Sequence, residues 1–324
     1  MEAYVKAIGS WRTIKKATVL TSDLCIDSLD TEQSTLSVFG SVINRSDVGN
    51  WLIVNGSVYL IHQVKPQDGK TVLTLLHPID AFARLLPFAE PSAGQTIGGF
   101  VADMLQKHWA VCDDPVYALP YLTVSNSDTV AFVSPNLDNS GLFSLTEYCR
   151  LMRKTYRVAV EFRAAGDTLA CTISIMPAAS RQVSFSDGRS HLKSVDYAAA
   201  GVSKITAIQD GVSTTWYLSE DGEVTQEIPA QRASGAWKTI SVAANANVAA
   251  KVAETFAKDR SGHKVEFSSE LDMNVLDSCK FLINGELLNS YISNKGKSFA
   301  DNRFHYKAGE LATTASEKLR GVTK

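Results

Sequence analysis

The sequence predicts an α+β fold that is mostly β, with two similar β modules on either side of a mixed helix and strand domain. An Asn-Gly pair lies between strand-like runs at residues 51–64, and the same arrangement returns at residues 281–293. This pair predicts a hairpin because both residues tolerate the positive φ of a type I′ turn. The apolar spacing of two amphipathic helices falls between the two hairpins, at residues 97–105 and 145–152.

The first hairpin turns at Asn55 and Gly56, which sets Trp51 opposite Leu60. Both of its faces carry large apolar side chains, so neither can be fully solvated. The expected faces are Ile53, Tyr59 and Ile61 on one side, and Leu52, Val58 and Leu60 on the other. The sheet must therefore be covered, or shared with a partner.

Further strand candidates give the first module about five strands, and they lie at residues 18–20, 35–39 and 71–76. Pro78 then opens a helical pattern that continues to Leu86. Pro87 and Pro91 interrupt this pattern and indicate a boundary near residue 90. The first module is accordingly expected to span residues 1–90.

The middle α+β domain is expected over residues 91–190. Thr96 caps its first helix, and a Ser-Leu-Thr-Glu capping box starting at Ser144 begins its second. The clearest alternation in the chain follows at residues 156–175 and predicts a hairpin with one solvated face. A polar stretch at residues 113–139 reads as loops with one or two short strands.

The second module is expected over residues 191–324, with a helical insertion near residues 246–260 that Asn247 caps. Residues 202–218 predict a hairpin that turns at Asp210-Gly211. The polar residues 229–245 are expected to be irregular. A strand follows at residues 263–268.

The end of the chain repeats the pattern of its beginning. A turn at Asn284 and Gly285 is followed by an expected turn at residues 294–296, a strand with Tyr306, and a helical pattern over residues 311–319. Such meanders also arise independently, and that alternative stays open. If the modules are duplicates, three chains present six module positions, which suits docking of a threefold ring on a sixfold one.

Composition excludes some partners and points to a soluble protein made in the cytoplasm. The 324 residues are 20% charged with a formal net charge of -2, so bulk electrostatics gives no reason to expect a nucleic acid or an anionic membrane as partner. No signal segment and no membrane-spanning run of about 18 apolar residues is found. The five cysteines are scattered, without a metal or redox pair, and are expected to be reduced.

Catalytic motifs are missing, so no enzyme, cofactor or metal site is predicted. His77 and Asp80 could form an acid–base pair, but a strand end followed by a helix cap explains both. Asp113 and Asp114 could act as a glycosidase-like acid pair, but a solvated loop explains them better. The residues singled out are therefore structural: Asn55, Gly56, Asn284 and Gly285, at the turns of the two modules.

Two further features bear on partners. Residues 295–324 hold seven Lys and Arg against three acidic residues, which could meet an acidic partner or could be a solvated chain end. A receptor-binding or carbohydrate-binding protein should cluster exposed aromatic side chains, whereas the tryptophans are dispersed along the sequence.

Several stretches resemble the tail-hub proteins of tailed bacteriophages, the group related to the baseplate hub of contractile tails and to the N-terminal part of siphophage tail-associated proteins. The resemblance covers most of the chain. It is carried by diffuse structural patterns at residues 50–61, 79–86, 216–225, 262–267, 291–293, 304–309 and 317–320.

The resemblance implies two tube-like β-barrel modules per subunit and a homotrimeric ring at the tail tip that adapts a sixfold tail tube to a threefold tip. The implied partners are the tail tube or distal tail protein and a tip, spike or receptor-binding protein, while DNA passes through the lumen without specific binding. The implied location is the virion tail, after assembly in the host cytoplasm. A host-surface receptor or carbohydrate binder of the tail tip is the alternative.

Overall fold

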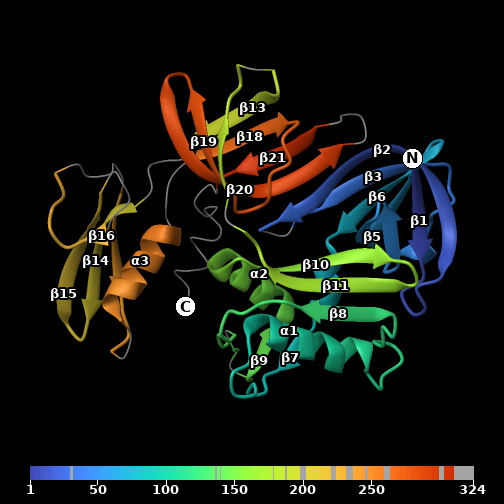
Figure 1. Cartoon of the computed structure of the whole chain (residues 1–324), viewed down its shortest axis with the longest axis horizontal. Helices are drawn as coiled ribbons and strands as arrows, with labels where there is room; N and C mark the ends of the chain where they lie inside the picture. Colours follow the sequence, from blue (N-terminus) through green and yellow to red (C-terminus); the bar gives the residue numbers. More distant parts are fainter. Residues whose placement is uncertain are drawn as a thin grey trace. The chain divides into compact units, whose positions relative to one another are not determined.

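The computed structural model is mostly β, with 52% of the chain in strands and 15% in helices, as the sequence predicts (Figure 1). It describes residues 1–29, 32–135, 137–138, 140–177, 179–186, 188–197, 202–219, 224–230, 236–244, 247–258, 263–298 and 303–309. The chain divides into two compact units, of which the first joins Met1–Ser190 to Ser268–Tyr306 and the second joins His191–Phe267 to Lys307–Lys324.

Six strands of the first unit close into a β-barrel, drawn in blue and blue-green in Figure 1. They are β1 (Glu2–Lys6), β2 (Thr13–Ser28), β3 (Ser34–Phe39), β4 (Trp51–Val54), β5 (Ser57–Gln67) and β6 (Lys70–Leu76). Each pairs antiparallel with two neighbours in the cyclic order β1, β4, β5, β6, β3, β2. The module has one strand more than predicted, because β1 fills the gap between β2 and β4. Closure leaves the paired segments without a free edge.

The barrel encloses its own apolar core, which includes Leu52 and Tyr59. These two residues pair across the hairpin, as Ile53 and Val58 do on the opposite face. The prediction that grouped Ile53 with Tyr59, and Leu52 with Val58, was therefore wrong. It assigned side chains to alternate faces along each strand but did not use the register of the turn, which sets the partners opposite each other on one face. The predicted apolar character of both faces is confirmed, since all four side chains are buried.

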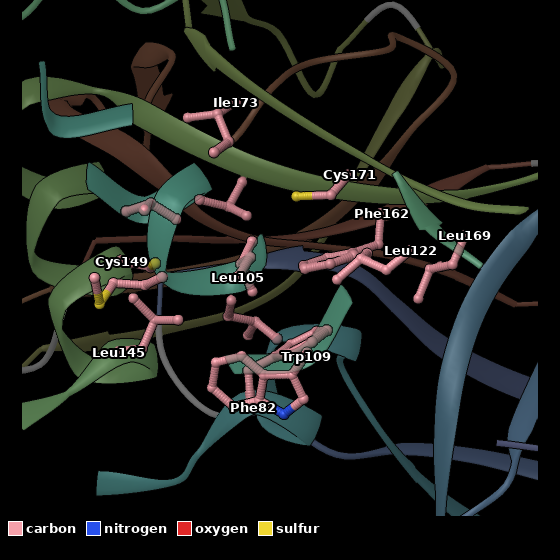
Figure 2. Packing of buried hydrophobic residues seen from close by; sticks show 14 of the residues in the cluster. Phe82, Leu105, Trp109, Leu122, Leu145, Cys149, Phe162, Leu169, Cys171 and Ile173 are labelled. Carbon is pink, nitrogen blue, oxygen red and sulfur yellow. The ribbon is translucent and has the colours of Figure 1, made fainter. Parts of the chain in front are cut away.

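The outer face of the first hairpin joins a second apolar core, formed with the segment that follows β6. This segment contains η2 (Pro78–Phe82), β7 (Leu85–Pro87), α1 (Ile97–Leu105), the π-helical η3 (Gln106–Ala110), β8 (Leu122–Asn126), β9 (Leu142–Ser144), α2 (Leu145–Tyr156), β10 (Val158–Ala165) and β11 (Thr168–Ile175). Phe82 stacks on Phe162 with ring centroids 5.2 Å apart and meets the edge of Trp109 at 5.1 Å (Figure 2). Trp51, Ile53 and Val58 of the barrel wall are buried in the same core, which therefore holds the wall to this segment.

The predicted helix starts are confirmed, whereas one predicted helix is too long. The hydroxyl of Thr96 accepts a hydrogen bond from the amide of Gly99 at 3.0 Å, and Ser144 caps α2 in the same way. The pattern from Pro78 to Leu86 is helical only as far as Phe82. Leu86 lies in β7 because it precedes Pro87, a position that disfavours helical backbone, and β7 pairs with β9 instead.

The second hairpin comprises β19 (Ser278–Ile283) and β20 (Glu286–Ser298), and β12 (Ser180–Val183) pairs parallel to β19. The turn predicted at residues 294–296 was wrong, because β20 continues through them. The hydrogen-bonding partner of that stretch is β2, more than 260 residues earlier, which no local pattern reveals. β21 (Phe304–Ala308) confirms the strand predicted around Tyr306, and the helical pattern over residues 311–319 lies outside the described residues.

The second unit contains β14 (Val202–Gln209), β15 (Val212–Leu218), β16 (Val224–Thr225), β17 (Ala236–Ser241) and α3 (Val248–Lys258). It also contains β13 (Ser190–Tyr197) except its first residue and β18 (His263–Ser269) except its last two. Four of these strands form a sheet in the order β16, β15, β14, β17. Asn247 caps α3 as predicted, and Val252 and Phe256 pack against Ile205 of β14. The irregular structure predicted for residues 229–245 was wrong over β17, an edge strand whose polar side chains hide its β pattern.

Candidate functional site

The candidate functional site is the first barrel, the second hairpin and the junction between them. At the first turn, Asn55 and Gly56 have φ values of 51° and 78°, and Trp51 pairs with Leu60 as predicted. At the second turn, Asn284 and Gly285 have φ values of 53° and 83°. Both turns therefore use the left-handed backbone that their residue types allow.

The two hairpins differ in what covers them. In the first hairpin, Ile53 lies two residues before Asn55 and Val58 lies two residues after Gly56. The two form a cross-strand pair that is buried in the aromatic core. The corresponding pair of the second hairpin is Leu282 and Leu287, whose side chains are 64% and 59% exposed. A cross-strand pair of exposed leucines is an apolar contact surface without an occupant within the described residues.

Strand β2 connects the barrel to the second hairpin. Its first part belongs to the barrel wall, and its last part pairs antiparallel with β20, from Asp23 with Ser298 to Ser28 with Asn294. Gly296 pairs with Cys25 in this seam, and a Cβ atom added to it would lie 3.1 Å from the backbone oxygen of Leu24. A larger residue there would push the two strands apart.

Three arginines of α2 and its C-terminal cap surround the same junction. Arg153 forms a salt bridge with Asp27 of β2, and Arg150 forms one with Asp80 of η2. Arg157, in the left-handed conformation, donates to the backbone oxygen of Leu276 at 2.9 Å. One helix therefore holds the barrel strand, η2 and the approach to the second hairpin by charge-assisted hydrogen bonds.

His77 and Asp80, weighed above as an acid–base pair, have structural roles. The Nδ1 atom of His77 accepts a hydrogen bond from the amide of Ile79 at 3.3 Å and caps η2, as the sequence predicts. Burial lowers the pKa of His77 to about 4, so the imidazole is neutral at pH 7. The carboxylate of Asp80 pairs with Arg150. A small cavity of about 40 Å³ beside His77 is lined by Cys25, Cys149 and Arg153 among others.

The structure also locates the acidic pair, the basic segment and the tryptophans that the sequence analysis considered. Asp113 and Asp114 lie in an exposed loop, where Asp114 caps the turn that follows, as expected. The basic segment is not uniformly solvated, because Lys295 is nearly buried and pairs with Asp272. Trp11 and Trp51, which are dispersed in the sequence, meet in the fold with ring centroids 6.5 Å apart, but both are buried and so form no exposed aromatic cluster.

The thiols and metal-binding groups give no site of their own. All five cysteines are free, and burial raises the pKa of Cys149 to about 12. In the part of the chain that the structure describes, no three His, Cys, Asp or Glu side chains are grouped to bind a metal ion. None of its described helices combines the length and apolar character needed to cross a membrane.

The junction arginines are the residues that sequence reasoning missed. Arg150, Arg153 and Arg157 follow the i, i+3, i+7 spacing of one helix face, and that pattern was a readable signal. Their partners Asp27 and Asp80 were not readable, because the pairing is tertiary.

No protein-family model and no curated protein matches the chain. Among the solved structures that are similar to this chain over nearly their whole length are two phage tail proteins. Prophage tail protein gp18 from Listeria monocytogenes EGD-e has 9% identity and a TM-score of 0.56, with 99% of this chain and 98% of that chain covered. The 43 kDa tail protein of prophage MuSo2 from Shewanella oneidensis has 12% identity and a TM-score of 0.51, with 97% and 99% covered.

The chain has the fold of these tail proteins. The resemblance to phage tail proteins that the sequence patterns indicate is thus confirmed at the level of the fold. At 9% and 12% identity the likeness carries no residue roles.

Proposed function

We propose that this chain is a structural hub protein in the tail of a phage or a phage-like injection device, without enzymatic activity. Three copies form a ring at the tail tip that adapts the sixfold tail tube to a threefold tip and surrounds the DNA channel. One side of the ring meets the tail tube or distal tail protein, and the other meets a tip, spike or receptor-binding protein. DNA passes through the lumen without specific binding.

The observation that carries this proposal is a closed barrel tied, through β2 and β20, to a second hairpin with the same turn geometry. If the second hairpin belongs to a second tube-like module, one chain supplies two module positions and three chains supply six. Cyclic symmetry then gives the pseudo-sixfold surface that a sixfold tube requires. The tail-protein fold supports the same reading.

The hypothesis of two tube-like modules per chain gives the proposed division into domains. Residues 1–90 form the first tube-like module, residues 91–190 form the middle domain, and residues 191–324 form the second module with its insertion. The pair Leu282–Leu287 then has a defined role. The middle domain covers the equivalent pair in the first module, and a neighbouring subunit covers Leu282 and Leu287 in the ring.

Electron-microscopy class averages of the purified full chain, alone and with its tail-tube protein, test the proposal. We expect threefold rings with an open lumen, and a mass of three chains by native mass spectrometry. A chain that stays monomeric under both conditions contradicts the ring. Glycoside or peptide hydrolysis by the purified chain contradicts the non-enzymatic role.

A further inference from the structure

The four-stranded sheet of the second unit packs one face against α3, and no other described element covers its opposite face, called the open face below. Ile205 and Ala207 of β14 point to α3 and are buried. The residues that alternate with them point to the open face, together with their cross-strand partners. We propose that this open face binds a glycan. The sugar rings would stack on Trp237 and Tyr217 and form hydrogen bonds with the serine and threonine hydroxyl groups of the sheet.

The register places the open-face side chains in three rows across the strands. The first row is Thr225, Tyr217, Lys204 and Trp237, the second is Thr215, Thr206 and Thr239, and the third is Ser213, Ile208 and Ser241. Seven of these ten residues carry a side-chain hydroxyl, which can both donate and accept a hydrogen bond. Such a surface matches a ligand that presents many hydroxyl groups of its own.

The two aromatic side chains of the first row are held apart at a fixed spacing. Tyr217 and Trp237 lie on either side of β14, so two strand spacings, about 10 Å, separate their backbones. The ammonium group of Lys204 lies 4.1 Å from the ring centroid of Trp237 and 5.8 Å from that of Tyr217. The cation therefore holds both rings in place from one side.

Trp237 is oriented as well as exposed. Its indole Nε1 donates to the hydroxyl of Thr206 at 3.0 Å, which satisfies the polar atom of the ring. The side chain is nevertheless 65% exposed, so most of the indole surface faces solvent. A pre-oriented and exposed aromatic ring can stack on the C–H face of a sugar ring with little loss of side-chain entropy.

The composition of this face favours a glycan over a protein or a nucleic acid. A protein interface would be expected to centre on a buried apolar cluster, whereas Ile208 is the one aliphatic side chain among the ten. A nucleic acid would require several cations along its phosphates, whereas Lys204 is the one charged side chain among them. Aromatic rings surrounded by hydroxyl groups fit a neutral or weakly acidic glycan.

Binding of the full chain to an array of immobilised bacterial surface polysaccharides tests the proposal, with a 20-nucleotide poly-dT strand as the nucleic-acid probe. We expect retention by at least one polysaccharide and none by poly-dT. The substitutions Trp237→Ala and Tyr217→Ala should each weaken that binding at least tenfold. Val212→Ala is the matched control, because Val212 is also 65% exposed but lies outside the three rows.

Circular dichroism of each variant separates loss of binding from loss of folding. Loss of binding with an unchanged spectrum and an unchanged Val212→Ala control supports the glycan site. Three results overturn it: retention by no polysaccharide, binding by Trp237→Ala equal to that of the unsubstituted chain, or retention by poly-dT in place of polysaccharide. The site lies wholly in the second unit, so ring formation measured in the same preparation is a separate outcome.

Discussion

Burial determines the charge of His77, and four charged side chains surround it. The carboxylates of Asp27 and Asp80 favour the imidazolium, while the guanidinium groups of Arg150 and Arg153 oppose it. Desolvation is the largest influence and holds the pKa of His77 near 4, below the 6.5 of an unperturbed imidazole. Between these two pH values the unfolded chain binds a proton that the folded chain does not.

Stability should therefore fall as the pH drops from about 6.5 to about 4, by on the order of 3 kcal/mol from this group. His77→Asn keeps a side chain that can cap η2 but removes the titration, so its urea unfolding free energy should vary less over this range. His62→Asn is the control, because His62 is exposed. An unchanged pH dependence in His77→Asn would contradict the assignment.

The two hairpin turns depend on glycine for backbone reasons alone. A Cβ atom added at Gly56 or Gly285 meets nothing within 4 Å, but the φ values of 78° and 83° are strained for any other residue. Gly56→Val and Gly285→Val should each cost about 1 to 2 kcal/mol of unfolding free energy. Gly9→Val separates the causes, because Gly9 also has open space but lacks a positive φ. Equal stability of all three variants would exclude a special role for the turns.

At the level of elements, the salt bridge between Arg153 and Asp27 ties α2 to β2. The two side chains are only 9% and 17% exposed, so removal of one leaves a nearly buried charge without its partner. Arg153→Met should lower the unfolding free energy by about 3 kcal/mol, measured by urea denaturation. The double variant Asp27→Leu, Arg153→Met should be more stable than the single variant.

An exposed ion pair provides the comparison for that experiment. Arg163 and Glu161 are 78% and 46% exposed, so Arg163→Met should change the unfolding free energy by less than about 1 kcal/mol. Equal losses from Arg163→Met and Arg153→Met would show that burial of the junction is unimportant.

Elements specified by local chemistry could be predicted from the sequence. The hairpin at Asn55-Gly56 and the helix starts at Thr96 and Ser144 follow from residues within one turn of each other. Elements whose structure depends on residues distant in the sequence could not be predicted. β20 continues through Asn294 because β2, more than 260 residues earlier in the chain, pairs with it.

In the candidate site, too, local features could be predicted from the sequence and tertiary contacts could not. Its turns were predictable, whereas the salt bridge of Arg153 and the exposure of Leu282 depend on which elements meet in the fold. The clustering of Tyr217 with Trp237 depends in the same way on the parallel pairing of β17 with β14, since the two residues are 20 positions apart in the sequence.

For the whole molecule, the proposed ring makes the exposed leucine pair an assembly contact. Leu282→Lys with Leu287→Lys should abolish rings in class averages and leave the melting temperature of the monomer nearly unchanged, because both side chains already face solvent. Val116→Lys is the control, since Val116 is 80% exposed in a loop of the middle domain. Intact rings in the double variant would place the subunit contact elsewhere.

The seam between β2 and β20 also sets an order of events during synthesis. The six barrel strands are complete once Leu76 has been made. The last residues of β2, from Asp23 to Ser28, have no partner on one side until Ser298 emerges. At elongation rates of roughly 5–20 residues per second, this edge waits on the order of 10 to 45 s. A nascent chain at that stage carries an open strand edge that can pair wrongly, so chaperone protection should matter most in this interval. Chains released before Ser298 is made would lack this seam.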